Sequence, residues 1–146
     1  MSSASDVEAY AKKAGASLDE TSRAIVLDLF GKIIKDTPAD TGRARGNWQT
    51  TIGAPANGEV SRTGEDGAIA ELNSAVASFG AGKIIYLTNN LPYIRALEYG
   101  GYGTGPYATS KTTRDGFSVQ APYGMVRVGI ARIQSIVAKA ARDNKI

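Results

Sequence analysis

The sequence of 146 residues contains no cysteine and no histidine. Without cysteine the chain has neither a disulfide nor a thiol nucleophile. Without histidine it lacks the commonest general base and the commonest ligand of transition metals. Asp36 and Asp40 lie four residues apart, but two acids fall short of the oxygen set that Ca²⁺ requires. The sequence therefore predicts no enzyme, no cofactor and no metal site.

The sequence also lacks a long apolar run. No stretch approaches the roughly 20 apolar residues of a membrane-spanning helix. The first six residues have neither the basic region nor the apolar core of a secretory signal. We therefore expect no membrane partner, and a protein that stays in the cytosol or leaves it by lysis or assembly.

The composition is typical of a soluble globular protein, with 42% hydrophobic and 21% charged residues. A chain of this length suffices for one domain with a modest core. We predict a single domain over residues 1–146. Residues 1–16 are expected to form an N-terminal arm or short helix, and residues 100–122 an extended loop.

The net charge of +3 is concentrated near the C-terminus, where residues 107–146 carry seven basic and two acidic side chains. Such asymmetry is compatible with nucleic acid as a partner, or with a solvated basic face. A basic module that binds DNA without sequence preference is therefore one functional hypothesis, and its affinity should fall with salt. The residues that would face DNA are Arg127, Arg132, Lys139 and Arg142.

Apolar residues at three- and four-residue spacing predict two long helices. The first covers residues 18–35, after Gly15 and Ser17 end a short helix and cap the next one. The second covers residues 124–144. Its expected apolar stripe comprises Val126, Ile130, Ile133, Val137 and Ala140.

Shorter elements are predicted between the two long helices. Strand composition marks residues 45–52 and residues 83–89, and the second strand should lie centrally in the sheet. Helices are expected at residues 68–79 and, after Pro92, up to residue 99. Residues 53–67 form a polar loop, with a short strand at residues 59–63 as the alternative.

The stretch from Asp36 to Trp48 is predicted to be a rigid structural turn. Pro38 cannot continue the preceding helix, and Asp40 and Thr41 can bond their own backbone. Gly42 permits a positive φ. The simplest interpretation is a corner that buries the only Trp and directs two arginines outward, namely Trp48, Arg43 and Arg45.

Glycines and aromatic and basic residues gather in the region of residues 99–117. A loop of about 20 residues inside a compact domain is usually functional or disordered. The mixture suits stacking on single-stranded bases or a protein interface. We predict that the subunit or partner interface contains Arg43, Arg45, Tyr99, Tyr102, Tyr107, Arg114 and Phe117.

Four short motifs in a fixed order resemble the tailed-bacteriophage neck and tail-completion proteins (HK97 gene 10-like and minor tail protein Z-like). The family signature TPVDTGRLR is similar to TPADTGRAR at residues 37–45, which Trp48 follows. The remaining motifs are IYLTNNLPY at residues 85–93, LEYG at residues 97–100 and QAPYGMVR at residues 120–127.

The resemblance implies a small α+β protein with two long helices packed on a small antiparallel sheet and a long Gly-rich loop or hairpin. It implies a structural virion protein of the neck or tail, assembled in the host cytoplasm. Such a protein completes the tail and joins it to the capsid connector as an oligomeric ring, expected to be a hexamer. The implied partners are further copies of itself, the tail terminator or tail tube, head-closure and connector proteins, and DNA passing through the ring.

Overall fold

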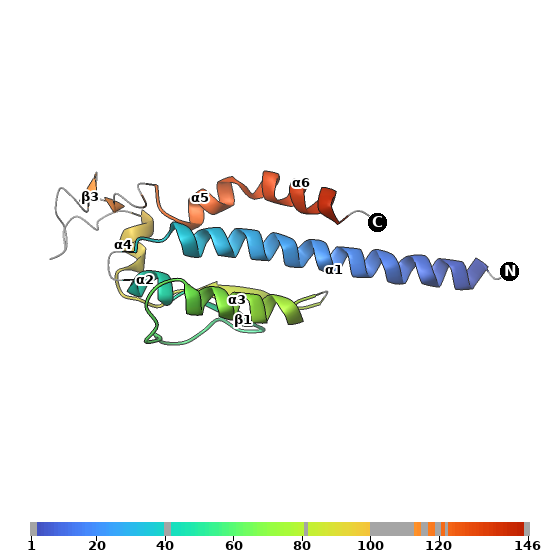
Figure 1. The fold of residues 1–146 in the computed structure, drawn as a ribbon, viewed down its shortest axis with the longest axis horizontal. Helices are drawn as coiled ribbons and strands as arrows, with labels where there is room; N and C mark the ends of the chain where they lie inside the picture. Colours follow the sequence, from blue (N-terminus) through green and yellow to red (C-terminus); the bar gives the residue numbers. More distant parts are fainter. Residues whose placement is uncertain are drawn as a thin grey trace.

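The computed structural model is an α+β fold built along one long helix (Figure 1). It describes residues 3–39, 42–80, 82–99, 113–114, 117–118, 121 and 123–144. The elements in chain order are α1 (Ser3–Asp36), α2 (Arg43–Gly46), β1 (Gln49–Ile52), α3 (Asp66–Ser78), β2 (Ile85–Thr88), α4 (Ile94–Tyr99), β3 (Thr113–Arg114), β4 (Phe117–Ser118), α5 (Val126–Ala131) and α6 (Ile133–Asp143).

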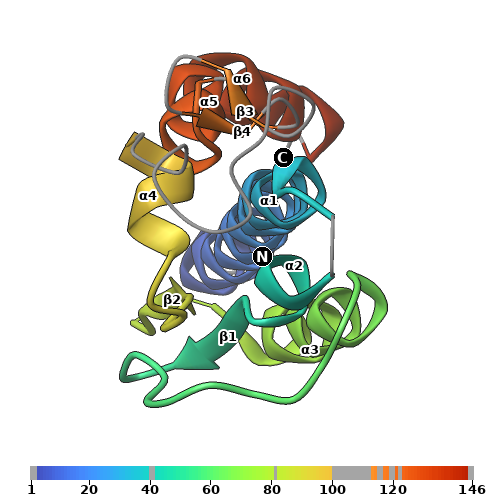
Figure 2. The same ribbon diagram turned by 90° about the vertical axis from the view of Figure 1, so that its left-hand side faces the viewer.

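Helix α1 lies between two layers (Figures 1 and 2). Helix α3 and the β1–β2 pair lie on one side, and α5 and α6 lie on the other. The core is centred on the C-terminal half of α1, where Ile33 and Ile34 are buried with Leu72 of α3. Helix α1 is therefore the common support of both layers.

The predicted break in the first helix is wrong, because α1 runs without interruption through Gly15 and Ser17. A single glycine costs a helix only about 1 kcal/mol, and the residues around it include good helix formers. Ser17 does not cap a helix. Its hydroxyl donates to the carbonyl of Asn144 just after α6, so it serves a tertiary contact.

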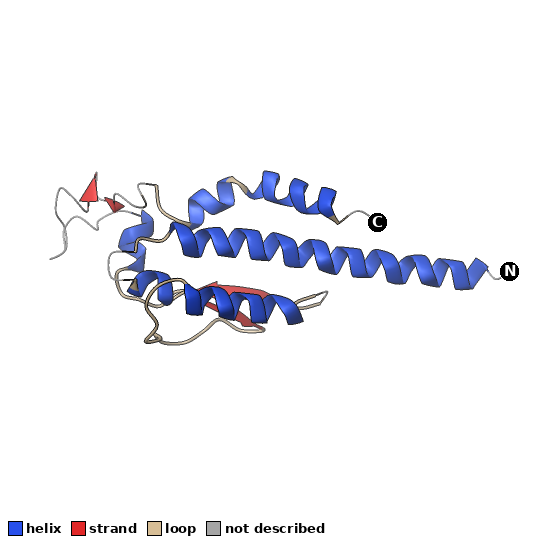
Figure 3. Ribbon diagram, in the orientation of Figure 1, coloured by secondary structure: helices blue, strands red, loops and turns tan. Residues whose placement is uncertain are grey.

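The sheet is smaller than expected (Figure 3). Strands β1 and β2 are antiparallel, with Gln49 opposite Thr88 and Ile52 opposite Ile85. In the described part of the chain β2 pairs with β1 alone, so its predicted central position is wrong. The predicted start of the first strand is also too early, because residues 43–46 form α2. Residues 59–63 are loop, not strand.

The predicted helix at residues 124–144 consists of two helices, α5 and α6, separated at Arg132. The Arg132 N–H donates to the carbonyl of Gly129 in a tightened turn. Gly129, Ile136 and Ala140 are buried, whereas Ile130 and Val137 of the predicted stripe are exposed. A Cβ at Gly129 would lie 3.1 Å from atoms of Leu29 and Ile33. Helix α5 therefore approaches α1 closely at this position, and this close approach favours a small residue on the side that faces α1.

The helices at residues 68–79 and after Pro92 are confirmed as α3 and α4. In the segment at residues 100–122, predicted as a loop or hairpin, the structure describes an antiparallel pair, β3 with β4. Arg114 lies opposite Phe117 in its register. Tyr102 and Tyr107 lie outside the described residues.

Candidate functional site

The turn after α1 is fixed to the last turn of that helix by a buried chain of hydrogen bonds. The Trp48 indole Nε1–H donates to the Thr37 hydroxyl at 2.7 Å. That hydroxyl donates to the carbonyl of Ile33, also at 2.7 Å. Both side chains are buried, which confirms the predicted core position of Trp48 and explains the direction of the chain after the turn.

Gly42 has the predicted positive φ, 73°. Its carbonyl accepts the Gly64 N–H at 2.7 Å, so the loop after β1 returns to the turn. A Cβ at Gly42 would lie 2.6 Å from the Gly64 nitrogen. Glycine is required here for both its conformation and its size. Pro38, which follows the end of α1, is buried, and Asp40 and Thr41 lie outside the described residues.

The two arginines of the turn have different environments. Arg43 is exposed and forms an ion pair with Glu59. The prediction that both point outward is wrong for Arg45, which lies against the end of α1. Its Nε and Nη2 donate there to the carbonyls of Thr37 and Lys35, both at 2.8 Å. These carbonyls lie at the negative end of the helix dipole, so Arg45 satisfies the C-terminus of α1. A basic residue shortly after a helix end is the sequence signal for this role.

Arg62, which no sequence pattern singled out, lies across the corner from the loop after β1. Its Nε donates to the carbonyl of Gly46 and its Nη2 to the carbonyl of Trp48, both at 2.9 Å. It also forms an ion pair with Glu71 of α3 at 3.3 Å. Arg62 therefore connects α2, β1 and α3.

The turn after β2 is bonded to α2. The Asn89 side-chain amide donates to the carbonyl of Ala44 at 2.9 Å. Its side-chain oxygen accepts the N–H of Leu91 at 3.2 Å, which shapes the turn that leads to Pro92. The motif at residues 85–93 is thus joined to the motif at residues 37–45.

Glu98 joins the other two motifs. Its side chain is buried, with the residue 6% exposed, and its carboxylate accepts three backbone N–H groups. These belong to Met125, Val126 and Arg127, at 2.9, 2.6 and 3.0 Å. Helix α5 has no N-cap side-chain bond of its own, so a carboxylate from α4 satisfies its first turn. The sequence signal for such a contact is the absence of a capping residue before Val126, which leaves the first N–H groups of α5 in need of an acceptor from elsewhere.

Gly124 makes the contact with Glu98 sterically possible. Its φ is 85°, and a Cβ there would lie 1.9 Å from Glu98 Oε2 and 2.6 Å from the Glu98 carbonyl oxygen. Arg127 completes the joint, because its Nη2 donates to the Glu98 carbonyl and its Nε lies 3.7 Å from the carboxylate. We call these residues together, 37, 42–48, 89–91, 98 and 124–127, the hub.

We found no protein-family model, curated protein or solved structure that matches the chain. The resemblance therefore stands on the four motifs of the sequence.

An aromatic and basic patch lies on the surface beside the hub. Tyr99 is exposed at the end of α4, and the guanidinium carbons of Arg127 and Arg95 lie 5.1 and 5.9 Å from its ring centroid. Cation–π contacts of this kind contribute about 0.5–1 kcal/mol at exposed sites. Tyr123 is also exposed. We call Arg95, Tyr99 and Arg127 the tyrosine–arginine patch.

The predicted DNA-facing residues are mostly close to carboxylates. Arg127 lies beside Glu98, Arg132 Nη1 is 3.7 Å from Asp36 Oδ2, and Lys139 Nζ is 3.1 Å from Asp143 Oδ2. Among the described residues, Arg142 is the member of this set without such a neighbour. These ion pairs reduce the positive charge that the second half of the chain can present to phosphates.

In the described part of the chain, no group of three or more acidic residues is placed to hold a metal ion. The helices that the structure describes are too short or too polar to cross a bilayer. The hub joins the turn after β2 to α2, and it joins α4 to the start of α5.

The different environments of Arg43 and Arg45 lead to a matched prediction. Arg45→Met should lower the free energy of unfolding by about 1–2 kcal/mol, because two carbonyls at the α1 C-terminus lose a charged donor. Arg43→Met should change it by less than about 0.5 kcal/mol, since its ion pair is exposed. Urea unfolding followed by the fluorescence of Trp48 measures both. Equal effects of the two substitutions would contradict this assignment.

Proposed function

We propose that the protein is a structural virion protein of the phage head–tail junction, where it completes the tail and joins it to the capsid connector as an oligomeric ring. The observation that carries the proposal is that the four motifs, which occur in the family's order, bond to one another in two pairs. Asn89 bonds to Ala44, and Glu98 bonds to the backbone of residues 125–127. The motif residues therefore make tertiary contacts that shape the fold, as expected if the motifs are a family signature.

The surface around the hub also fits a role in assembly. Tyrosine and arginine are enriched in protein interfaces. Arg43 and the tyrosine–arginine patch expose both residue types on elements that the hub holds rigidly. Preformed side chains of this kind lose little conformational entropy on binding. We propose this surface as the contact with a neighbouring subunit or neck protein.

The proposal predicts a multi-copy complex. Native mass spectrometry of the chain, expressed alone and together with connector and tail-tube proteins, should find a ring of several copies, with six expected from the resemblance. Purified virions should contain the chain at the neck. A protein that remains monomeric with every one of these partners and is missing from particles would contradict the proposal.

Substitution in the patch tests the surface separately from the fold. Tyr99→Ala combined with Arg43→Glu should lower the unfolding free energy by no more than about 2 kcal/mol, because both side chains are exposed and the main loss is the two cation–π contacts of Tyr99. Particle yield should fall at least about tenfold, as expected when central aromatic and arginine contacts are lost. Ile84→Ala, at another exposed apolar residue, is the control and should leave the yield unchanged. Normal yield from the double variant would exclude this surface.

A further inference from the structure

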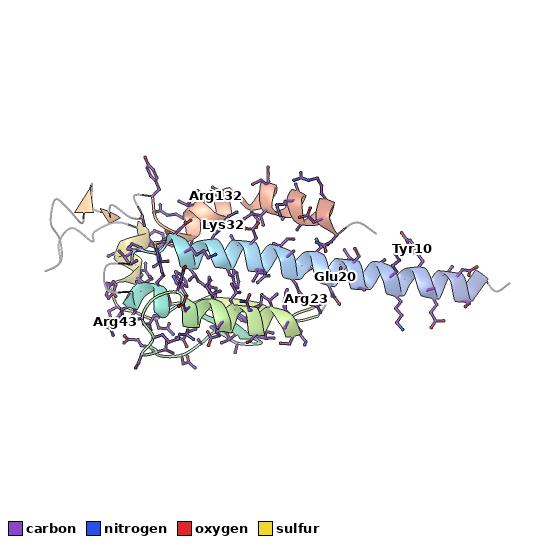
Figure 4. The ribbon with its side chains drawn as sticks, viewed as in Figure 1. Tyr10, Glu20, Arg23, Lys32, Arg43 and Arg132 are labelled. Carbon is purple, nitrogen blue, oxygen red and sulfur yellow. The ribbon has the colours of Figure 1, made fainter. Side chains whose placement is uncertain are left out.

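Helix α1 extends well past the two layers that pack against its C-terminal half (Figures 1 and 4). The layer of α5 and α6 ends where the carbonyl of Asn144 accepts a hydrogen bond from the Ser17 hydroxyl. The layer that contains α3 ends just after that helix. There the Arg23 guanidinium donates to the carbonyl of Phe79, and Asp19 lies against Gly80. We call residues 3–16, which lie beyond these contacts, the projecting segment. At about 1.5 Å per residue it is roughly 21 Å long.

The projecting segment carries an apolar stripe. Val7 is 67% exposed, Tyr10 is 65% exposed, and Leu18 just beyond the segment is 64% exposed. Ala11 and Ala14 fall on the same face by their three- and four-residue spacing. These exposed side chains share one face of a continuous helix. The stripe is therefore available to a second helix.

The charges beside the stripe identify the orientation of that helix. At 100° per residue, Asp6 and Lys13 lie along one side of the stripe, and Glu8 and Lys12 lie along the other. On each side the acid precedes the base. Two copies in antiparallel orientation therefore place acid against base on both sides, whereas a parallel pair in register places like charges level with each other.

The register of an antiparallel pair follows from the same residues. With a two-fold axis near Tyr10, Glu8 lies level with Lys12 of the other copy, and Asp6 lies next to Lys13 of the other copy. Val7 then packs over Ala11 and Ala14 of the second helix. Ser3 reaches the level of Ser17, the residue at which α6 ends.

We propose that the projecting segment pairs in antiparallel orientation with the same segment of a second copy of the chain. The contact is isologous, because the same stripe is used on both copies. It is short compared with interfaces of about 1,200–2,000 Å², so the isolated pair is weak, with a dissociation constant on the order of micromolar or higher. This pairing is independent of the proposed function and requires only the purified chain.

The absence of cysteine from the sequence allows a direct test by cross-linking. The single thiol of Tyr10→Cys lies at the two-fold axis and should give a disulfide-linked dimer under mild oxidation. Ala9→Cys, also exposed but on the opposite face, is the control and should remain monomeric on a non-reducing gel. Val7→Cys should also remain uncross-linked, because its two copies are about 9 Å apart along the axis and a disulfide needs Cα atoms within about 7 Å.

A charge exchange tests the same register by sedimentation velocity. Asp6→Lys alone and Lys13→Glu alone should each weaken dimerisation about five- to tenfold, because each places like charges together. The double variant restores opposite charges and should return to within about twofold of wild type. A wild-type chain that stays monomeric up to about 1 mM would overturn the proposal. Cross-linking of Val7→Cys as fast as Tyr10→Cys would show a parallel pair and would also overturn it.

Discussion

Glu98→Gln is expected to lower the free energy of unfolding by about 2–4 kcal/mol. The carboxylate accepts the N–H groups of Met125, Val126 and Arg127 in a buried position. Glutamine keeps the size of the side chain but turns one acceptor into a donor, so at least one of these N–H groups loses its partner. The charge opposite the α5 dipole is lost at the same time.

Urea unfolding followed by Trp48 fluorescence measures this effect, and far-ultraviolet circular dichroism reports the loss of α5. Glu59→Gln is the matched control. Glu59 forms an exposed ion pair with Arg43, and its substitution should change the unfolding free energy by less than about 0.5 kcal/mol. If the two glutamine variants were equally stable, Glu98 would not be what holds the start of α5.

Gly124→Ala is expected to destabilise the protein by at least about 3 kcal/mol. Two effects combine at this position. The φ of 85° strains any residue with a Cβ, and that Cβ would lie 1.9 Å from Glu98 Oε2. Moving the Glu98 carboxylate away would relieve the clash but would break its hydrogen bonds to α5. No shift of this side chain therefore avoids a loss of stability.

Two alanine controls separate these effects. Gly58 has a φ of 73° and no atom within 4 Å of the position that a Cβ would take, so Gly58→Ala should show the backbone strain alone, about 1–2 kcal/mol. Gly15 lies in α1 with the same open space and no positive φ, so Gly15→Ala should stabilise the protein by up to about 1 kcal/mol. Thermal and urea unfolding of all three variants should give this order. A Gly124→Ala protein no less stable than Gly58→Ala would contradict the steric account.

Local sequence signals are sufficient for much of the fold. Periodicity and turn residues predict helix α3, strand β2 and the helix after Pro92, and Gly42 and Trp48 have the conformation and burial expected. The expected break at Gly15 is wrong because one unfavourable residue does not end a helix whose neighbours include good helix formers. The expected buried face of α5 and α6 is confirmed at Ala140 and wrong at Ile130 and Val137, which are exposed. Gly129 faces α1 instead, and the size of apolar side chains does not reveal such close packing.

The roles of Glu98 and Arg62 could not be predicted from the sequence, because both depend on contacts between distant residues. Glu98 bonds to residues 27 to 29 positions later in the chain. Arg62 bonds to the corner 14 to 16 positions earlier. A charged side chain in a turn or at a helix end has many partners within reach, and only the packing of the helices selects one. The role of Tyr102 and Tyr107 in an interface stays a prediction.

The use of Glu98 in place of a local cap has a consequence for the order of folding. During synthesis α1 to α4 leave the ribosome before α5, and N-terminal structure generally forms first. Until residues 125–127 emerge from the ribosome, the Glu98 carboxylate can bond only to water, because the three N–H groups that it accepts in the fold are not yet available. We therefore expect α5 and α6 to close onto α1 only after α1 to α4 have formed.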